Sequence, residues 1–197
     1  MVTILCIRKC LCNEAIVHSI FAEVRVRPDI IISAGDMSSP EILDFLSNLS
    51  QYIVGVIGEN DDPSISKWLK TKGVLLDGKT LSLSIGPERI KFAGLGVNVN
   101  QEVVGRLRKD NYDIFVTYYP PLLLGNKFMG RYSVGYGFLD EIIESACPSL
   151  VVVGLSYEAP IIIDKNNILY LSPSPCYRGG YMLLEYDFEK LRIISYR

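Results

Sequence analysis

The chain has 197 residues, of which 49% are hydrophobic and 21% are charged, and its formal net charge is −2. This length and composition are those of an ordinary globular protein with one sizeable core, so we expect a single domain over residues 1–197. The slightly acidic balance lacks the basic face that duplex binding needs, and no apolar run reaches the roughly 18 residues of a membrane span, so we expect neither nucleic acid nor a membrane as a partner.

The first half of the chain alternates short apolar runs with segments of helical period. Buried strands are predicted over Val2–Ile7, Asp29–Gly35 and Tyr52–Gly58. Helices are predicted over Glu14–Val24, Ser38–Leu49 and Ser64–Gly73. The second helix begins with serine and proline, as a capped helix should, and the third ends on glycine. This β-α-β-α order predicts a parallel sheet with right-handed crossovers.

The second half of the chain has a different pattern. A Gly-Pro turn joins two strand-like segments into a predicted hairpin over residues 81–96. Helix, strand, helix and strand are then expected over residues 101–109, 112–119, 137–148 and 149–156. The last stretch, 159–197, is typical of strands joined by turns rich in asparagine and glycine. The sequence therefore predicts an α/β domain with an antiparallel ending.

In open α/β sheets, sites gather at the carboxyl ends of strands, so the residues that follow each predicted strand are the first candidates. Five such strand exits carry polar residues. They are Arg8–Asn13, Gly35–Glu41, Gly58–Pro63, Thr117–Pro121 and Gly154–Pro160.

In their order and spacing, these exits resemble the motifs of the calcineurin-like metallophosphoesterase superfamily. Residues 29–46 are similar to that family's Gly-Asp segment, and VIGENDDP (56–63) is similar to its Gly-Asn-His/Cys-Asp segment. DIFVTYYPP (113–121) is similar to its Thr-His-x-Pro-Pro strand exit, and LVVVGLSYEAP (150–160) is similar to its Gly-His-x-His segment. The resemblance runs nearly end to end and implies an α/β fold of parallel and mixed β-sheets, sandwiched and flanked by α-helices.

Members of that family hold two divalent metals with Asp, His and Asn side chains, and the metals activate water and polarise a phosphoryl oxygen. Several ligand positions of that pattern are changed in this chain. Lys9 and Leu11 stand where the first motif has Asp-x-His. Tyr118, Leu155 and Tyr157 stand where the later motifs have histidine. The resemblance therefore implies a vestigial site rather than a complete one.

Four positions keep oxygen or amide donors. Asp36 matches the family's bridging carboxylate, and Glu59 stands at its Asn ligand position. Asn60 replaces the residue often used as a general acid, and Asp61 matches the acid beside it. His18 is the only histidine and lies within the first predicted helix, far from the strand exits. Asp36 and Glu59 are thus weak candidates for one hard cation such as Mg²⁺ or Mn²⁺, and too few for a dinuclear centre.

An ammonium group at a ligand position repels a divalent cation. We therefore hypothesise that Lys9 replaces the lost metals by pairing with Asp36, and also with Glu59, since a buried carboxylate needs a partner. The alternative is that Lys9 points to solvent. The rings of Tyr118 and Tyr157 are expected to fill the space of the metals and histidines, with hydroxyls that hydrogen-bond to Asp36 or Glu59.

These changes favour a catalytically inactive scaffold that binds a protein partner or a second copy of itself. The resemblance offers precedents, because a retromer subunit and the small subunits of some DNA polymerases use this fold largely as scaffold. One alternative is a phosphoesterase with an atypical single-metal site built from Asp36, Glu59, Asn60 and Asp61. Another is a sensor that binds phosphate or a nucleotide through Arg8, Lys9 and the tyrosines.

Cysteine usage bears on the cellular compartment. Five cysteines are an odd number, and their scatter fits reduced thiols better than a disulfide framework. The first ten residues are too short and too soon charged for a secretory signal. We therefore expect a cytoplasmic protein.

Overall fold

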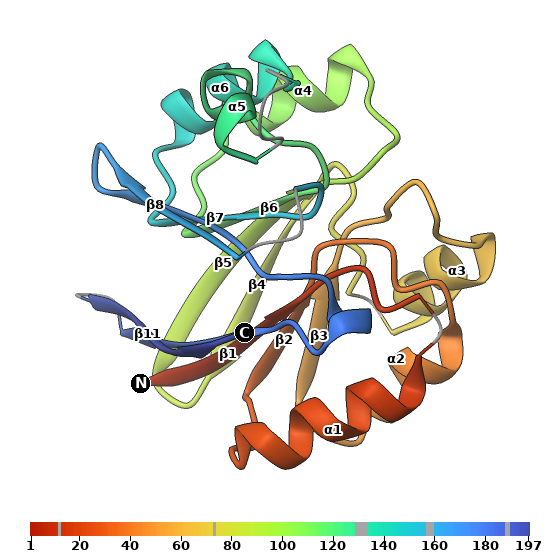
Figure 1. The fold of residues 1–197 in the computed structure, drawn as a ribbon. Helices are drawn as coiled ribbons and strands as arrows, with labels where there is room; N and C mark the ends of the chain where they lie inside the picture. The colour runs from red at the N-terminus through yellow and green to blue at the C-terminus, as the bar shows by residue number, and fades with distance from the viewer. Residues whose placement is uncertain (12, 73, 129–133, 157–159, 188–189) are drawn as a thin grey trace.

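Two β-sheets packed face to face form the centre of the molecule, and helices cover the outer face of each sheet (Figure 1). The computed structural model describes residues 1–197 except 12, 73, 129–133, 157–159 and 188–189. The strands are Val2–Ile7 (β1), Ile30–Ser33 (β2), Tyr52–Gly55 (β3), Lys79–Ile85 (β4), Glu88–Leu95 (β5), Ile114–Thr117 (β6), Leu150–Val153 (β7), Ile161–Lys165 (β8), Ile168–Ser172 (β9), Met182–Asp187 (β10) and Lys190–Tyr196 (β11). The helices are Glu14–Val24 (α1), Pro40–Ser47 (α2), Pro63–Thr71 (α3), Gln101–Leu107 (α4), Gly125–Phe128 (α5) and Gly137–Ala146 (α6), with 3₁₀ turns at Leu122–Leu124 (η1) and Cys176–Arg178 (η2).

The first sheet has the order β11-β10-β1-β2-β3. Strands β1, β2 and β3 are parallel, while β10 pairs antiparallel with both β1 and β11. The short parallel strands are buried on both faces, which explains their unbroken Ile and Val runs. Strand β2 ends at Ser33, before the predicted Gly35, because Gly35 and Asp36 have φ angles of 97° and 58° and leave the extended conformation.

The second sheet has the order β4-β5-β6-β7-β9-β8. Its inner strands β5, β6, β7 and β9 are parallel, and β4 and β8 are antiparallel edge strands. The predicted hairpin over residues 81–96 is confirmed as β4–β5. The predicted run of terminal strands divides between the sheets, because the β8–β9 hairpin joins the second sheet and the β10–β11 hairpin joins the first. The expected α/β class with mixed sheets between helices is confirmed.

Apolar side chains fill the space between the sheets and under the helices. Residues such as Ile4, Ile32, Phe92 and Val116 form the core between the sheets. Helices α1, α2 and α3 pack on the first sheet through a second apolar cluster, and α4 and α6 pack on the second sheet through a third. Within the described residues, no helix combines the length and apolar character that crossing a bilayer requires.

Local sequence signals set where the helices begin. The Asn13 side chain accepts a hydrogen bond from the Ile16 backbone N–H at the start of α1, at 3.2 Å. Asp62 does the same for Ser64 at the start of α3, at 2.8 Å, with Pro63 as the first helical residue. The Asp62 cap fixes where the loop after β3 ends, and that loop carries part of the candidate site.

Candidate functional site

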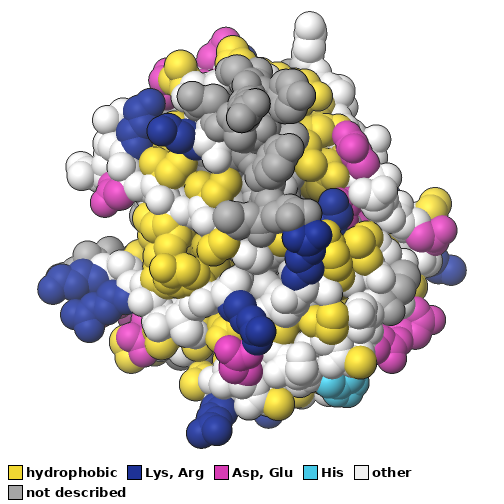
Figure 2. Space-filling view, viewed as in Figure 1, with side chains coloured by type: hydrophobic (Ala, Val, Ile, Leu, Met, Phe, Trp, Pro, Cys, Tyr) yellow, Lys and Arg dark blue, Asp and Glu magenta, His cyan; other side chains and the backbone are white. Residues whose placement is uncertain are grey.

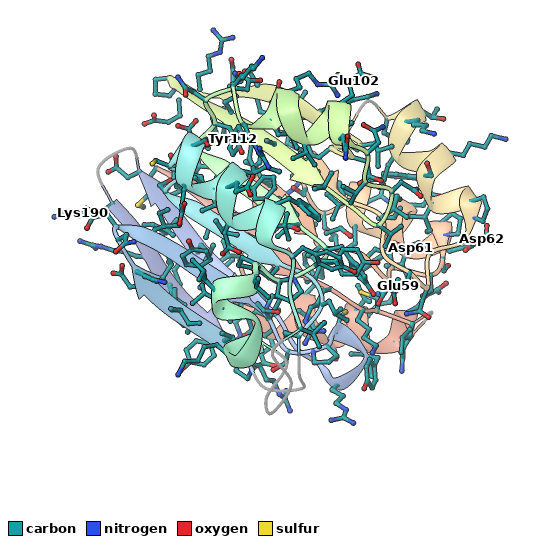
Figure 3. The ribbon with its side chains drawn as sticks, turned by 90° about the horizontal axis from the view of Figure 1, so that it is seen from above. Glu59, Asp61, Asp62, Glu102, Tyr112 and Lys190 are labelled. Atoms are coloured by element: carbon teal, nitrogen blue, oxygen red, sulfur yellow. The ribbon has the colours of Figure 1, made fainter. Side chains whose placement is uncertain are left out.

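The carboxyl ends of parallel strands from both sheets meet at one edge of the sandwich. Asp36 follows β2, Glu59–Asp61 follow β3, and Tyr118 follows β6. Figure 3 shows Glu59 and Asp61 together on the turn that leads into α3. Hydrogen bonds between the loops join these residues, although Asp36 and Tyr118 are 82 positions apart in the chain. Backbone hydrogen bonds from Lys9 to Gly35 and from Leu155 to Tyr118 join the other two exits, so the structure brings all five candidate exits into contact.

Asp36 is the centre of this contact. The carboxylate is 4% exposed, and both of its oxygens accept hydrogen bonds. The Asn60 backbone N–H donates to Oδ1 at 2.9 Å. The Asn60 side-chain amide and the Tyr118 hydroxyl donate to Oδ2 at 3.2 and 3.1 Å. The expected bond from Tyr118 to Asp36 is confirmed, and the oxygens that a bridging carboxylate would offer to metals already have protein donors.

Three glycines make room for the Tyr118 ring. A Cβ atom on Gly35 or Gly58 would lie 2.8 Å from a ring carbon of Tyr118, and one on Gly154 would lie 3.2 Å away. The ring therefore fills the space between the strand exits, and Tyr118 is only 1% exposed. Burial and then the negative charge of Asp36 raise the pKa of Tyr118. The hydroxyl thus keeps its proton and acts as the donor.

The buried cation beside Asp36 is Arg8, which directly follows β1. Arg8 is 2% exposed, and its Nε donates to the Pro173 carbonyl at 2.6 Å. Burial lowers the pKa of Arg8 to about 10, while attraction to Asp36 and Tyr118 opposes the shift. Arg8 therefore stays protonated at neutral pH and offsets the charge of the buried carboxylate.

Lys9 has a different role from the one we predicted. Among the ion pairs of the described residues, none joins Lys9 to Asp36 or Glu59. Lys9 is half-buried and has a φ angle of 52°. Its backbone N–H donates to the Gly35 carbonyl at 3.0 Å, and its carbonyl accepts from Tyr177 at 3.2 Å. Position 9 thus ties three loops together through its backbone.

Asp61 also acts on the backbone. The N–H groups of Asp36 and Gly58 donate to its Oδ2 at 2.9 and 2.7 Å, and the Ser38 N–H donates to Oδ1 at 3.0 Å. These bonds hold Asp36 and Ser38 at positive φ angles, which non-glycine residues seldom adopt. Burial raises the pKa of Asp61, and the three N–H donors oppose that shift. The carboxylate clamps the loop after β2 onto the loop after β3.

Glu59 lies on the exposed side of the same turn. The Tyr119 hydroxyl donates to Glu59 Oε1 at 2.8 Å. The Tyr119 ring packs against Tyr118 and Tyr136, with centroid separations of 5.1 and 4.6 Å. Burial and the bond to Glu59 raise the pKa of Tyr119. Sequence reasoning gave Tyr119 no role, although two consecutive tyrosines at one strand exit place their rings on opposite sides of the chain.

Two of the three remaining candidate positions, Leu11 and Leu155, carry aliphatic side chains. Leu11 is 40% exposed. Leu155 is half-buried and packs against the core between the sheets, and its N–H donates to the Tyr118 carbonyl at 2.6 Å. Tyr157 lies outside the described residues. Leu11 and Leu155 supply no metal ligand.

Asp77 is a half-buried acid that sequence reasoning missed. It lies between α3 and β4 and accepts a hydrogen bond from the Ile57 backbone N–H at 3.1 Å. Burial and then the charge of Asp61 raise the pKa of Asp77 to about 6, while the backbone N–H groups of Ile57 and Gly96 and the charge of Lys70 oppose the shift. Asp77 thus holds the backbone of the loop after β3 at Ile57.

The donor set does not fit a divalent metal. Among the described residues, no three His, Cys, Asp or Glu side chains form a group that could hold one. Asp36 is satisfied by Asn60 and Tyr118, Asp61 by backbone N–H groups, and Glu59 turns to Tyr119. The oxygen donors that the sequence offered are thus directed to different partners.

Comparison with known proteins identifies the fold. No family model matches the chain, and no curated protein is found as a relative. Solved structures do match over nearly the whole chain. The protein TT1561 of Thermus thermophilus superposes with a TM-score of 0.70 at 15% identity, covering 98% of this chain and 97% of its own. A predicted phosphoesterase of Streptococcus pneumoniae has a TM-score of 0.55 at 16% identity, covering 98% and 87%. The chain has the calcineurin-like phosphoesterase fold.

A third match broadens the set of proteins that share this fold. Vacuolar Protein Sorting 29 of Cryptosporidium parvum has a TM-score of 0.53 at 15% identity, covering 99% of this chain and 97% of its own. Identities this low establish the calcineurin-like fold alone, and function must be argued from the site. At that site Tyr118, Asn60 and Arg8 surround Asp36.

Proposed function

We propose that this protein does not hydrolyse phosphate esters and acts as a scaffold that binds a protein partner. One observation carries the proposal. The Tyr118 hydroxyl and Asn60 donate to both oxygens of Asp36, where an active relative would bind metals. Arg8 supplies positive charge to the same buried carboxylate. Protein groups thus do for Asp36 what bound cations would otherwise do.

The alternative of an atypical single-metal hydrolase has less support. It needs Asp36, Glu59, Asn60 and Asp61 to turn their donors toward one point. Asp61 is instead bonded to three backbone N–H groups, and Glu59 is bonded to Tyr119. One observation, the buried Arg8, supports the alternative of a phosphate sensor. The Nε of Arg8, however, donates a hydrogen bond to the Pro173 carbonyl, and the positive charge of Arg8 interacts with Asp36.

Two further observations support a cytoplasmic location and a protein partner. The described cysteines Cys6, Cys147 and Cys176 are free thiols, which is compatible with the proposed cytoplasmic location. The structural neighbours include Vacuolar Protein Sorting 29, whose name is that of a sorting protein rather than of an enzyme. A protein partner therefore fits this chain better than a small substrate.

The test is phosphoesterase activity with added metal. Wild-type protein and the Asp36→Asn variant are assayed on p-nitrophenyl phosphate and bis(p-nitrophenyl) phosphate with Mn²⁺ or Mg²⁺. We expect the same background rate in both proteins. A rate above background that the Asp36→Asn substitution abolishes would overturn the proposal, because a hydrolase of this fold needs its central carboxylate.

Calorimetric titration separates the alternatives when no turnover is seen. We expect no saturable heat when Mn²⁺ or inorganic phosphate is added to the wild-type protein. Stoichiometric Mn²⁺ binding that is lost in Asp36→Asn would favour the single-metal site. Saturable phosphate binding that is lost in Arg8→Met would favour the sensor.

A further inference from the structure

One side of the sandwich is open between two edge strands. β11 is the outer strand of the first sheet, and β8 is the outer strand of the second. Ile194 and Tyr196 on β11 are 48% and 54% exposed, and Ile162 on β8 is 40% exposed. Figure 2 shows hydrophobic side chains gathered on the surface between these two strands. Edge strands with exposed apolar residues are templates for pairing with another chain.

The other sheet edges differ from β11. The edge of β3 is covered, because Gly55 exchanges backbone hydrogen bonds with Val74 and Leu76 at 3.2 and 2.9 Å. Strand β4 is as long as β11, but its exposed side chains are polar: Lys79, Ser82 and Ser84. Of these three edge strands, only β11 is both seven residues long and lined with exposed apolar side chains.

From Lys190 to Ile193, side chains along β11 alternate between two environments, and the register with β10 shifts after Ile193, so that Ser195 pairs with Leu183. Leu191 and Ile193 are half-buried and pack against the core between the sheets. Their cross-strand neighbours on β10 are Tyr186 and Leu184, which belong to that core. A strand added outside β11 would place every second side chain over the same open core. The inner positions of such a strand therefore call for apolar residues.

The opposite face of β11 carries charge. Lys190 pairs in register with Asp187, and Arg192 pairs in register with Glu185. The basic side chains of β11 thus lie beside acidic side chains of β10. Opposite charges on neighbouring strands are favourable, whereas like charges directly opposite are not. The outer positions of an added strand therefore call for acidic residues beside Lys190 and Arg192.

We propose that β11 binds an extended segment of a partner protein in which apolar and acidic residues alternate. The segment adds to the first sheet as a sixth strand and covers the open side toward β8. A second copy of this chain is a poorer occupant, since two β11 strands would bring Lys190 and Arg192 of both copies onto one face. The proposal deepens the binding half of the proposed function and rests on it.

This surface is separate from the Asp36 site. Figure 3 shows Lys190 on the side of the molecule opposite to Glu59 and Asp61. Peptide binding at β11 and hydrolysis at the strand exits are therefore measured independently. Failure of the β11 proposal would leave the predicted absence of hydrolysis unchanged, and the reverse also holds.

The experiment uses two labelled probes, the eight-residue peptides (Glu-Val)₄ and (Lys-Val)₄ with blocked ends, measured by fluorescence anisotropy. We expect saturable binding of (Glu-Val)₄ and at least tenfold weaker binding of (Lys-Val)₄. The double charge reversal Lys190→Glu/Arg192→Glu should invert this preference. Lys79→Glu on the β4 edge is the matched control and should change neither affinity. All three substituted side chains are exposed, so each variant is expected to fold.

Hydrogen exchange locates the bound peptide. We expect (Glu-Val)₄ to slow amide exchange in β11 and to leave β4 unchanged. Absence of saturable binding, or binding that the β11 reversal leaves intact, would overturn the proposal. A dimer in sedimentation experiments that the same reversal dissociates would also overturn it, because a second copy would then be the occupant of the edge.

Discussion

The Tyr118 hydroxyl lies 3.1 Å from Asp36 Oδ2, and both residues are almost completely buried. One residue follows β6 of the second sheet, and the other follows β2 of the first. The bond therefore joins the two sheets at the edge where the carboxyl ends of β2, β3 and β6 meet. The Asp36 carboxylate is thus part of the protein's internal hydrogen bonding.

Removing this hydroxyl should destabilise the fold. Tyr118→Phe leaves a buried carboxylate oxygen with one donor fewer, which costs about 1–2 kcal/mol. Tyr112→Phe is the matched control, because Tyr112 is also buried but its hydroxyl makes only a long bond, 3.4 Å, to the Leu107 carbonyl. Urea unfolding measures both variants. An equal loss in the two would contradict a special role for the Asp36 contact.

The glycine at position 58 should be far less replaceable than an ordinary glycine. In Gly58→Ala the new Cβ would clash with Asp36 Oδ1 and lie 2.8 Å from the Tyr118 ring, so the site must distort. We expect a loss of about 3 kcal/mol in the free energy of unfolding.

Gly105→Ala is the control for this substitution. Gly105 lies in α4, and nothing lies within 4 Å of its Cβ position. Alanine there should stabilise the protein by up to about 1 kcal/mol, because glycine is a poor helix former. A Gly58→Ala variant as stable as wild type would show that the site is loosely packed.

The sequence predicts the order of strands and helices well, because buried runs and capped helices are local signals. It predicts contacts at the strand exits less well. Side chains alternate reliably along a strand, but the backbone leaves the extended conformation at Lys9, with a φ angle of 52°. Alternation therefore could not decide whether Arg8 or Lys9 faces Asp36. That choice depends on loops more than a hundred residues away, including Pro173.

Tyr119 and Asp77 show the same limit. Each acts through a loop whose path no local pattern specifies: Tyr119 reaches Glu59, and Asp77 reaches the backbone of Ile57. The fold of the sandwich places these loops side by side. Their contacts follow from the tertiary structure and not from the residues next to them in the chain.

Asp77 should make stability depend on pH in mildly acidic solution. Its pKa is raised by burial from 3.8 to about 6, so the folded state holds this proton more tightly than the unfolded state. The stabilisation is fully present below pH 3.8 and is lost as the pH rises through about 6. Because Asp77 is partly exposed, we expect an effect on the order of 2 kcal/mol.

The measurement compares wild type with Asp77→Asn, whose amide oxygen can still accept the Ile57 N–H. The difference in unfolding free energy, variant minus wild type, should grow as the pH rises from about 4 to about 7. Asp61 and Lys70, the charged groups that interact with Asp77, are the same in both proteins and so largely cancel. A pH-independent difference would refute the assignment of this titration to Asp77.

The last prediction separates Arg8 from Lys9. Arg8→Met removes the buried cation that interacts with Asp36 and should cost about 3–5 kcal/mol, because it leaves a buried carboxylate unpaired. Lys9→Met also replaces a long cationic side chain with methionine, but it should lower the free energy of unfolding by less than about 1 kcal/mol. Position 9 acts through its backbone, which the substitution leaves in place.

A double-mutant cycle tests the cause of that loss. Adding Asp36→Asn to Arg8→Met removes the unpaired charge, so the double variant should be more stable than the sum of the two single losses implies. The coupling should be absent when Lys9→Met replaces Arg8→Met. If Lys9 rather than Arg8 couples to Asp36, the charge that neutralises Asp36 is the one we first predicted. Additive losses in both cycles would mean that neither cation neutralises the buried carboxylate, and the account of how this site tolerates Asp36 without a metal would fail.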